Sequence, residues 1–214
     1  MRPEIVKINS KEPEASLVTY VAEKIRAGEV LGMPTDTYYG LAVDPFNLHA
    51  VDRVYEIKSR SRHKPLSLLI ESVDQAADVA WPVPEIFYLL ARRFWPGPLT
   101  IIVPASAKVP LKVTGNTGRL ALRQSRSRVA QALLDWLDQP LIATSANISG
   151  QPTCRSGIDV FGVMDGAVDL VLDAGPLAGF GATTVDITEP YWRVIREGAI
   201  PEKEIAECLK SAGT

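Results

Sequence analysis

The sequence contains few residues of the kinds that commonly act as nucleophiles or metal ligands. Only two cysteines and two histidines occur among 214 residues, namely Cys154, Cys208, His49 and His63. Their spacing fits neither a CxxC pair nor a Cys/His metal site, and it does not indicate a Ser/His or Cys/His nucleophile system. We therefore expect no protein-held metal and reduced, structurally ordinary thiols, as in a cytoplasmic protein.

Other absences narrow the class of protein further. The sequence has no Walker A pattern and no GxGxxG, so neither standard phosphate-binding loop is available. It has no apolar run long enough to cross a bilayer, and its first residues lack the apolar core of a signal peptide, so we expect no membrane association. The formal net charge is only -2, which argues against a generally basic nucleic-acid coat. Any anion-binding site must therefore be local.

Hydrophobic periodicity predicts strands that alternate with helices, which indicates an α/β fold. Hydrophobic residues make up 46% of the sequence and charged residues 22%, as in an ordinary globular protein. We expect one domain over residues 1–214 with a core of about 14–200, built on a twisted mixed β-sheet flanked by helices. Strands are predicted at residues 4–8, 29–33, 66–70, 99–104, 119–123, 141–144, 170–172, 183–187 and 193–196. Helices are predicted at 14–27, after Asn47, and at 72–80, 84–94, 126–137, 158–164 and 201–210, with a loop at 34–41.

The densest charge cluster lies between residues 58 and 64. Lys58, Arg60, Arg62 and Lys64 place four fixed positive charges, together with His63, within seven residues. Like charges repel one another, so an anion that lies across them is one explanation for the cluster. A solvated basic loop after a helix is the other, because the dipole at a helix C-terminus attracts cations. The residues alone leave both explanations open.

Three predicted strands run into loops or strand starts rich in hydroxyl and amide groups. These are Thr35 to Thr37, Thr144 to Asn147, and the pair Thr183 and Thr184. In open α/β sheets, ligands bind in the crevice beyond the strand ends, where small polar side chains can contact them. Two structural alternatives remain open: the threonines at 35 and 37 satisfy turn backbone, or Ser145 and Asn147 cap a helix.

Arginines are spread along the chain and could converge. They are Arg60, Arg62, Arg119, Arg123, Arg126, Arg128, Arg193 and Arg196. Arg119 and Arg123 share a face of their predicted strand. Ser125 is the predicted cap of the helix at 126–137, which puts Arg126 and Arg128 in an unfavourable first turn and indicates a surface role or an external anion. Convergence of several arginines with Lys58 and Lys64 would suit a polyanion such as a triphosphate.

Seven segments, in this order, resemble the YrdC-like family of threonylcarbamoyl-AMP synthases. They are PTDTYYGL at 34–41, KSR and KPL at 58–60 and 64–66, WPGPLT at 95–100, LALR at 120–123, TSANISG at 144–150, TTVD at 183–186 and IREG at 195–198. The resemblance implies a single α/β domain with a large, concave, positive face. Longer members of the family carry a second C-terminal domain, for which we expect no room in this sequence.

The resemblance also implies an activity and a set of site residues. Members make L-threonylcarbamoyladenylate and pyrophosphate from L-threonine, bicarbonate and ATP, with Mg²⁺ on the phosphates. A tRNA threonylcarbamoyl-transferase complex then modifies the adenosine next to the anticodon. By position, the threonine pocket would contain Thr37, Arg123, Ala143 and Thr183. ATP would contact Arg60, Lys64, Ser145, Asn147, Thr153 and Arg196, with Lys58 and Arg60 as catalytic residues.

This sequence departs from the family pattern at several positions, and other functions compete with synthesis. Ser59 and Ser61 replace a Gly and a Pro, Lys64 replaces an Asn, Arg119 stands where longer relatives have Thr, and Leu69 where they have His. A non-catalytic module that binds tRNA or double-stranded RNA would use the same basic face. Carbamoyl chemistry on another acceptor, as in hydrogenase-maturation proteins, is a third possibility.

Overall fold

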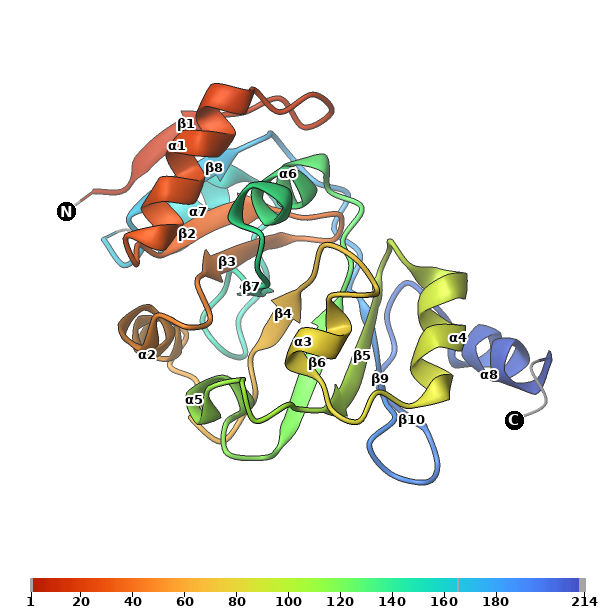
Figure 1. Cartoon of the computed structure of the whole chain (residues 1–214). Helices are drawn as coiled ribbons and strands as arrows, with labels where there is room; N and C mark the ends of the chain where they lie inside the picture. Colours follow the sequence, from red (N-terminus) through yellow and green to blue (C-terminus); the bar gives the residue numbers. More distant parts are fainter. Residues whose placement is uncertain (1, 165, 212–214) are drawn as a thin grey trace.

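A mixed β-sheet forms the centre of the molecule in the computed structural model, which describes residues 2–164 and 166–211 (Figure 1). Within these residues the ten strands have the order β1-β8-β2-β3-β7-β4-β6-β5-β9-β10. The strands are β1 Glu4–Lys7, β2 Leu31–Pro34, β3 Tyr39–Val43, β4 Ser67–Leu69, β5 Leu99–Pro104, β6 Arg119–Arg123, β7 Leu141–Ser145, β8 Leu170–Asp173, β9 Thr183–Asp186 and β10 Arg193–Arg196. The pairs β1–β8, β2–β8, β4–β6 and β5–β9 are parallel and the others antiparallel, which confirms the predicted mixed sheet.

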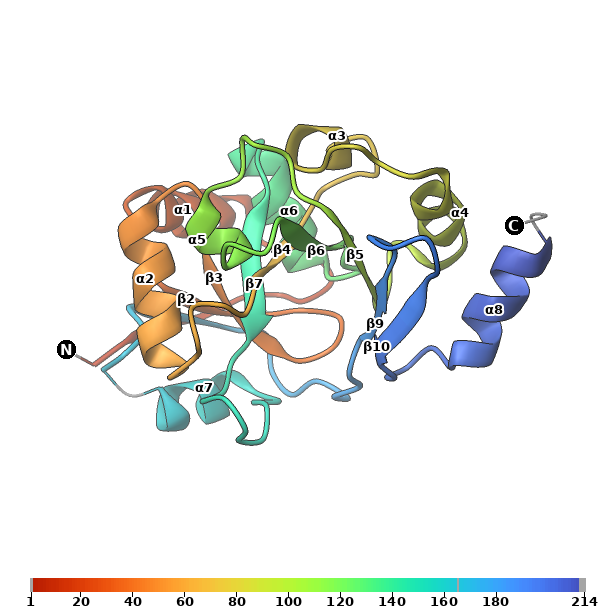
Figure 2. The same ribbon diagram turned by 90° about the horizontal axis from the view of Figure 1, so that it is seen from below.

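Helices flank this sheet on both faces. They are α1 Ala15–Arg26, α2 Leu48–Ile57, α3 Ala76–Val79, α4 Glu85–Phe94, α5 Leu111–Thr114, α6 Arg128–Leu137, α7 Gly157–Val163 and α8 Glu202–Ser211. In the part of the chain that the structure describes, no helix is both long and apolar enough to cross a membrane. The α8 helix packs beside α4 at one end of the molecule, and α2 lies beside α5 at the other (Figure 2).

The predicted helix-end signals act as expected at two positions. The side chain of Asn47 accepts a hydrogen bond from the Ala50 amide at 3.1 Å and so begins α2. Gly28, with φ of +86°, follows the end of α1 in a left-handed conformation that glycine adopts without strain. These local signals therefore place Lys58, the residue at the C-terminal cap of α2, at the entrance of the basic segment.

Two buried layers of apolar side chains lie on opposite faces of the sheet. One layer joins α1 and α6 to Leu31, Met33, Ala42 and Leu141 of the sheet. The other layer joins the remaining helices to the opposite side chains of the same strands. The α1 and α6 helices lie next to each other and cover the part of their face formed by β1, β8, β2 and the adjoining ends of β3, β7 and β4 (Figure 1). Among residues 2–164 and 166–211, no helix packs on the rest of that face.

The structure corrects the predicted loop at residues 34–41. Pro34 ends β2, Tyr39 begins β3, and the two strands form an antiparallel hairpin with a connection of only residues 35–38. The β3 strand is buried at all five positions, so it lacks the alternation of apolar and polar residues that indicates a half-buried strand. The polar residues are therefore held in a short turn between two buried strands.

Three helix predictions also change. The helix expected at 72–80 is reduced to the four residues of α3, and α5, which has the same length, was not predicted. The helix expected to start after Ser125 instead starts after Ser127, whose side chain accepts from the Ala130 amide at 3.3 Å. Arg126 therefore lies outside the helix, where its Nε donates to the carbonyl oxygen of Pro96 at 2.7 Å.

Candidate active site: a cationic cavity on the open half of the sheet

A cavity of about 630 Å³ occupies the helix-free half of the sheet face. Its floor follows from the strand register, because side chains that alternate along a strand point to opposite faces. Thr100 pairs with Thr184 and Ile102 with Asp186, and all four line the cavity. The intervening residues, such as Ile101 and Val185, point the other way into the apolar core.

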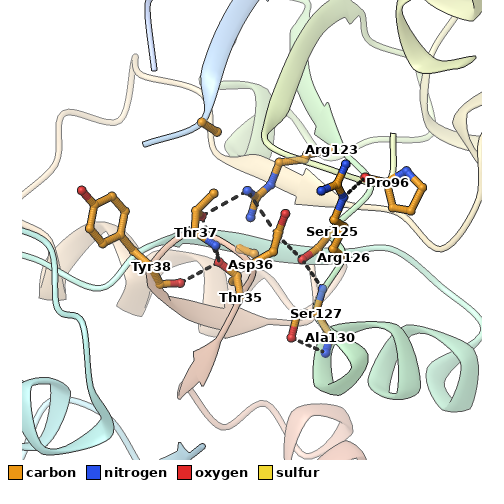
Figure 3. Close-up of polar contacts among 12 residues, drawn as sticks. Thr35, Asp36, Thr37, Tyr38, Pro96, Arg123, Ser125, Arg126, Ser127 and Ala130 are labelled. Atoms are coloured by element: carbon orange, nitrogen blue, oxygen red, sulfur yellow. Dashed lines mark hydrogen bonds and ion pairs between the residues drawn. The ribbon is translucent and has the colours of Figure 1, made fainter. Parts of the chain in front are cut away.

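Arg123 lies at the end of the cavity nearest to α6. Its Nη1 donates to Thr37 Oγ1 at 3.1 Å and lies 3.5 Å from Asp36 Oδ1 (Figure 3). The Arg123 side chain is only 8% exposed, and this burial lowers its pKa, which the charge of Asp36 opposes. A buried guanidinium directed at a cavity can bind a carboxylate through charge-assisted hydrogen bonds.

The sequence left open whether Thr35 and Thr37 satisfy the backbone of a turn or line a ligand site, and the two residues differ in this respect. Thr35 Oγ1 donates to the Tyr38 carbonyl at 2.6 Å and accepts from the Thr37 amide at 3.1 Å, so Thr35 completes the turn. Thr37 Oγ1 is 3.0 Å from Thr35 Oγ1 and accepts from Arg123. Both threonines line the cavity, but Thr37 is the one coupled to the buried cation.

Arg60 and Lys64 line the cavity at a different point from Arg123. Arg60 donates to the carbonyl oxygens of Pro65 at 2.8 Å and of Lys64 at 3.3 Å. These bonds fold the segment back on itself and bring the two cations together. Burial lowers the pKa of Arg60, but the ordinary value is so high that the side chain stays charged. Arg60 and Lys64 therefore place positive charge at the cavity, as the anion-binding explanation of the cluster requires.

Arg62 matches the other explanation of the cluster, a solvated basic residue after a helix. Its side chain is 54% exposed and forms ion pairs with Asp52 and, at 3.6 Å, with Glu56. It does not line the cavity. The charge cluster therefore separates into cavity residues and a surface residue that already has carboxylate partners.

Lys58 is buried beside the cavity and does not line it. Only 2% of the residue is exposed, and its Nζ donates to the Ser145 carbonyl, to Asn147 O at 3.0 Å and to Asn147 Oδ1 at 2.9 Å. Burial lowers the pKa of Lys58 to about 8, and the charge of Arg60 adds to this effect. Lys58 therefore contacts the loop at 145–147 and is not among the residues that line the cavity, and its catalytic role stays a prediction.

Ser145 faces the cavity because Lys58 and Asn147 hold its loop. Ser145 Oγ donates to Asn147 Oδ1 at 2.6 Å, and Asn147 Nδ2 donates to the Gln151 carbonyl at 2.7 Å. Asn147 is only 9% exposed and is not a lining residue. Neither residue caps a helix, since Ser156 caps the next one, α7. Asn147, predicted to contact a nucleotide, therefore supports Ser145 from behind.

Ala143, Thr153 and Arg196 also line the cavity, as the sequence predicted. Arg196 donates through Nη2 and Nε to the Ala182 carbonyl at 3.1 and 3.3 Å. The predicted site residues that meet in the one cavity are Thr37, Arg60, Lys64, Arg123, Ala143, Ser145, Thr153 and Arg196. The expected convergence of distant cations is thus confirmed for six of them, Arg60, Lys64, Arg119, Arg123, Arg193 and Arg196.

Thr183 does not belong to the cavity. It is fully buried on the opposite face, where Oγ1 donates to the Ile200 carbonyl at 2.7 Å and accepts from the amides of Gly198 and Ile200 at 2.9 and 3.0 Å. Its neighbour Thr184 lines the cavity instead. Side chains alternate along a strand, so Thr184 lies on the same face of β9 as Asp186, and Thr183 lies on the other face. This alternation is the signal in the sequence that separates the two threonines.

A second charged group lies at the far end of the cavity, and the sequence predicted its arginines, Arg119 and Arg193, as candidates but not its carboxylate, Asp186. Asp186 is buried and pairs with Arg119 at 3.1 Å and with Arg193 at 3.3 Å, while Arg119 also pairs with Glu189 at 2.6 Å. Burial raises the pKa of Asp186, but hydrogen bonds from Thr188 and Arg193 outweigh it, so the pKa is lowered. Tyr38, Ser67, Thr100 and Thr117 also line the cavity and were not predicted.

The residues present do not form a metal site. Among the described residues, Asp186 is the only carboxylate that lines the cavity, and two arginines already engage it. No group of three or more His, Cys, Asp or Glu side chains in residues 2–164 and 166–211 is placed to hold a metal ion. A Mg²⁺ ion would therefore have to arrive on the phosphates of a substrate.

Leu69 lies under α6 and outside the cavity. It is 2% exposed and belongs to the apolar layer that joins α1 and α6 to the sheet. The leucine side chain has no polar atom, so it cannot form a hydrogen bond to a ligand. The departure from the family pattern at Leu69 is therefore accommodated by packing, whereas Arg119 changes the charge of the cavity itself.

Comparison with known proteins relates this site to one family. A family model for Sua5, YciO and YrdC, described as "Telomere recombination", matches residues 23–198. The chain is 36% identical over 186 residues to the threonylcarbamoyl-AMP synthase of Pyrococcus abyssi, covering 86% of this chain and 55% of that protein. It is 39% identical over 162 residues to the threonylcarbamoyl-AMP synthase of Pseudomonas fluorescens, covering 76% of this chain and 86% of that protein.

A solved structure agrees with the sequence comparison. The crystal structure of P. abyssi Sua5 complexed with L-threonine superimposes with a TM-score of 0.91 at 34% identity, covering 96% of this chain and 60% of that one. This chain thus spans little more than half the length of the P. abyssi protein, and the matched part includes the sheet and the cavity. The chain belongs to the Sua5/YciO/YrdC family.

Proposed function

We propose that this chain is a threonylcarbamoyl-AMP synthase, a nucleotidyltransferase that joins L-threonine, bicarbonate and the adenylyl group of ATP. The observation that supports this most directly is the meeting of Arg60, Lys64, Arg123 and Arg196 in one cavity. They come from three separate segments of the sequence, at residues 58–66, 120–123 and 195–198. Relatives that carry this activity in their names match 86% and 76% of this chain.

The proposed reaction joins two negatively charged reactants. The threonine amine and bicarbonate, through CO₂, give a carbamate and water. A carbamate oxygen then attacks the α-phosphorus of ATP, an oxygen–phosphorus bond forms, and pyrophosphate leaves with the electrons of the broken bond. Carbamate and triphosphate repel each other, so the protein must neutralise charge and align the reactants. A cavity rich in arginine, lysine and hydroxyl groups fulfils that requirement without a nucleophile.

The two ends of the cavity divide the substrates between them. Arg123 would bind the threonine carboxylate, with Thr37 and Ala143 beside it. ATP would contact Arg60, Lys64, Ser145, Thr153 and Arg196, and Mg²⁺ would enter bound to its phosphates. Lys58 and Asn147 would act through the position of Ser145.

The product would serve a second reaction. The threonylcarbamoyl group is activated as a mixed anhydride with AMP, so it can pass to an amine acceptor. We propose that a tRNA threonylcarbamoyl-transferase complex performs this transfer to the adenosine next to the anticodon. The exposed part of the basic segment around Arg62 is available to RNA phosphates, but Asp52 and Glu56 already neutralise it, so the synthase function is better supported than RNA binding alone.

A pyrophosphate-release assay tests the proposal. Purified protein is supplied with Mg²⁺-ATP and with threonine, serine or no amino acid, each with and without bicarbonate. We expect release with threonine and bicarbonate together and little without either. If no release occurs and RNA binds with a steep salt dependence, the chain is the non-catalytic RNA-binding module instead.

Arg123→Ala provides the matching test of the threonine end. Loss of charge-assisted hydrogen bonds should weaken threonine binding by about 1.5–3 kcal/mol. ATP affinity should change little, because the ATP-contacting side chains lie elsewhere in the cavity. Both affinities can be measured by calorimetry with Arg123→Lys as a charge-preserving control, and an unchanged threonine affinity would contradict the assignment.

A further inference from the structure

Asp36 lies behind Arg123, on the side away from the large cavity. Its Oδ1 is 3.5 Å from Arg123 Nη1, and its side chain is 11% exposed. Arg123 and Thr37 line the large cavity, whereas Asp36 lines a separate cavity of about 440 Å³ next to the start of α6. The carboxylate therefore contacts the guanidinium from a direction that a ligand in the large cavity does not use.

Ser125 fixes the position of the Asp36 carboxylate. The Ser125 hydroxyl donates to Asp36 Oδ1 and accepts from the Ser127 amide at 3.2 Å, and Ser125 is 1% exposed (Figure 3). Gln131, on α6, donates to the Ser125 carbonyl at 3.1 Å. The carboxylate is thus tied to the first turn of a packed helix and cannot follow the guanidinium if it moves.

Arg123 needs such a support because its remaining contacts are few. A long side chain with a planar head must be held in one orientation to meet a carboxylate in a two-pronged contact. Thr37 provides the one side-chain hydrogen bond that Arg123 donates among the described residues, and Asp36 is its ion-pair partner. A buried cation without that partner would also carry the full cost of desolvation.

We propose that Asp36, held by Ser125, is a positioning residue that orients Arg123 to receive the carboxylate of the amino-acid substrate. This inference rests on the proposed function, in which that substrate is threonine. Asp36 makes no contact with the substrate, so it acts only through Arg123. The turn at residues 35–38 therefore contributes one residue on each side of the guanidinium, Thr37 in the cavity and Asp36 behind it.

In Asp36→Ala, the loss of orientation and the loss of charge have opposite expected effects on the affinity for threonine. The negative charge of Asp36 partly neutralises Arg123, so its removal alone would strengthen the attraction for an incoming carboxylate. Loss of orientation would weaken the same contact. Asp36→Asn removes the charge and keeps an oxygen that can accept from Ser125 and contact Arg123, whereas Asp36→Ala removes both.

The experiment compares the kinetic constants of both variants with those of the wild-type chain in the pyrophosphate-release assay. For Asp36→Ala we expect the KM for threonine to rise about tenfold or more, a kcat within about threefold, and a KM for ATP within about twofold. For Asp36→Asn we expect a KM for threonine within about threefold of wild type, because the orientation is kept.

Asp169 offers a matched control that separates positioning from general stability. It pairs with Arg53 at 2.7 and 3.0 Å and lines neither cavity, so Asp169→Ala should lower thermal stability without a selective effect on threonine. Equal losses for threonine and ATP in Asp36→Ala, an unchanged or lower threonine KM in that variant, or an equally large rise of the threonine KM in Asp36→Asn would each overturn the positioning role. If the wild-type chain shows no need for threonine, the proposed function fails instead, and the two failures are distinguishable.

Discussion

Met33 and Arg123 point to the same face of one sheet, but their surroundings differ completely. Met33, on β2, is fully buried under α1 and α6. Arg123, on β6, lines the large cavity on the part of the face that lies outside the apolar layer under α1 and α6. The covered half presents apolar side chains, so helices bury them with a gain in free energy. The open half presents threonines and arginines, which a helix could cover only at a large desolvation cost.

The comparison teaches that the same sheet separates stability from binding. Apolar residues of the covered half contribute mainly to folding, because they contact only each other. Polar residues of the open half contribute little to folding and are available to a ligand. The boundary between the halves runs past α6, whose first turn holds Ser125 and, through it, Asp36 behind Arg123.

The largest expected effect comes from a substitution that would create a new cavity among the apolar side chains of the covered half. Leu133 on α6 is fully buried, so Leu133→Ala should lower the free energy of unfolding by about 2–5 kcal/mol. Urea denaturation measures this, and Leu133→Met, which conserves volume, should cost less than about 1.5 kcal/mol. ATP affinity of the folded fraction should stay unchanged. A loss below about 1 kcal/mol, or a selective loss of ATP binding, would contradict the separation of the two halves.

Two arginines of the basic segment form the next test. Arg60→Ala should weaken ATP binding by about 1.5–3 kcal/mol, because Arg60 lines the cavity with a charged donor group. Arg62→Ala should change ATP binding and stability by less than about 1 kcal/mol, because Arg62 forms only surface ion pairs with Asp52 and Glu56. Calorimetric titration with Mg²⁺-ATP measures both. Equal effects would mean that the segment acts as a single cationic platform after all.

Adjacent threonines on β9 test the two faces within one strand. Thr183→Val leaves the amides of Gly198 and Ile200 without their acceptor and should cost about 1–3 kcal/mol of folding stability. Thr184→Val faces the cavity and should stay within about 0.5 kcal/mol of wild type. Thermal denaturation of both variants measures the difference. A larger loss for Thr184→Val would show that the two faces of β9 are assigned the wrong way round.

The last prediction is a gradual pH dependence of the free energy of unfolding that comes from Lys58. Its folded pKa is about 8 and its ordinary value 10.5, so the unfolded chain binds more protons between these values. Folding stability should therefore rise with pH in this window, by at most about 1.4 kcal/mol per pH unit, relative to Lys58→Met. Denaturation at several pH values measures the difference between the two proteins. A flat difference would show that the oxygens of Ser145 and Asn147 retain the proton despite burial.

Much of the fold could be predicted because its signals are local. The alternation of strands and helices, the cap at Asn47 and the turn at Gly28 depend on neighbouring residues only. The β3 strand could not be predicted in this way, since a strand buried on both faces shows no alternation. Its burial depends on β2 and β7, which lie on either side of it.

The features of the site can also be separated into those that the sequence predicts and those that depend on tertiary structure. The residue types, their order and their positive charge are properties of the chain alone, and they sufficed to predict a site for a polyanion and the family to which the chain belongs. Which members of a motif reach the cavity is a different matter. Lys58 and Arg60 are two residues apart, yet the first is buried against Ser145 and Asn147 while the second lines the cavity.

That choice depends on partners distant in sequence. Lys58 is drawn inward because the carbonyl and amide oxygens of residues 145–147 need donors, and Asp36 meets Arg123 because α6 holds Ser125 beside it. Neither pairing has a signature in the neighbouring sequence. The order of residues thus specifies which chemistry is present, and the packing of the sheet and α6 decides which side chains can perform it, because hydrogen bonds and burial act through space and not along the chain.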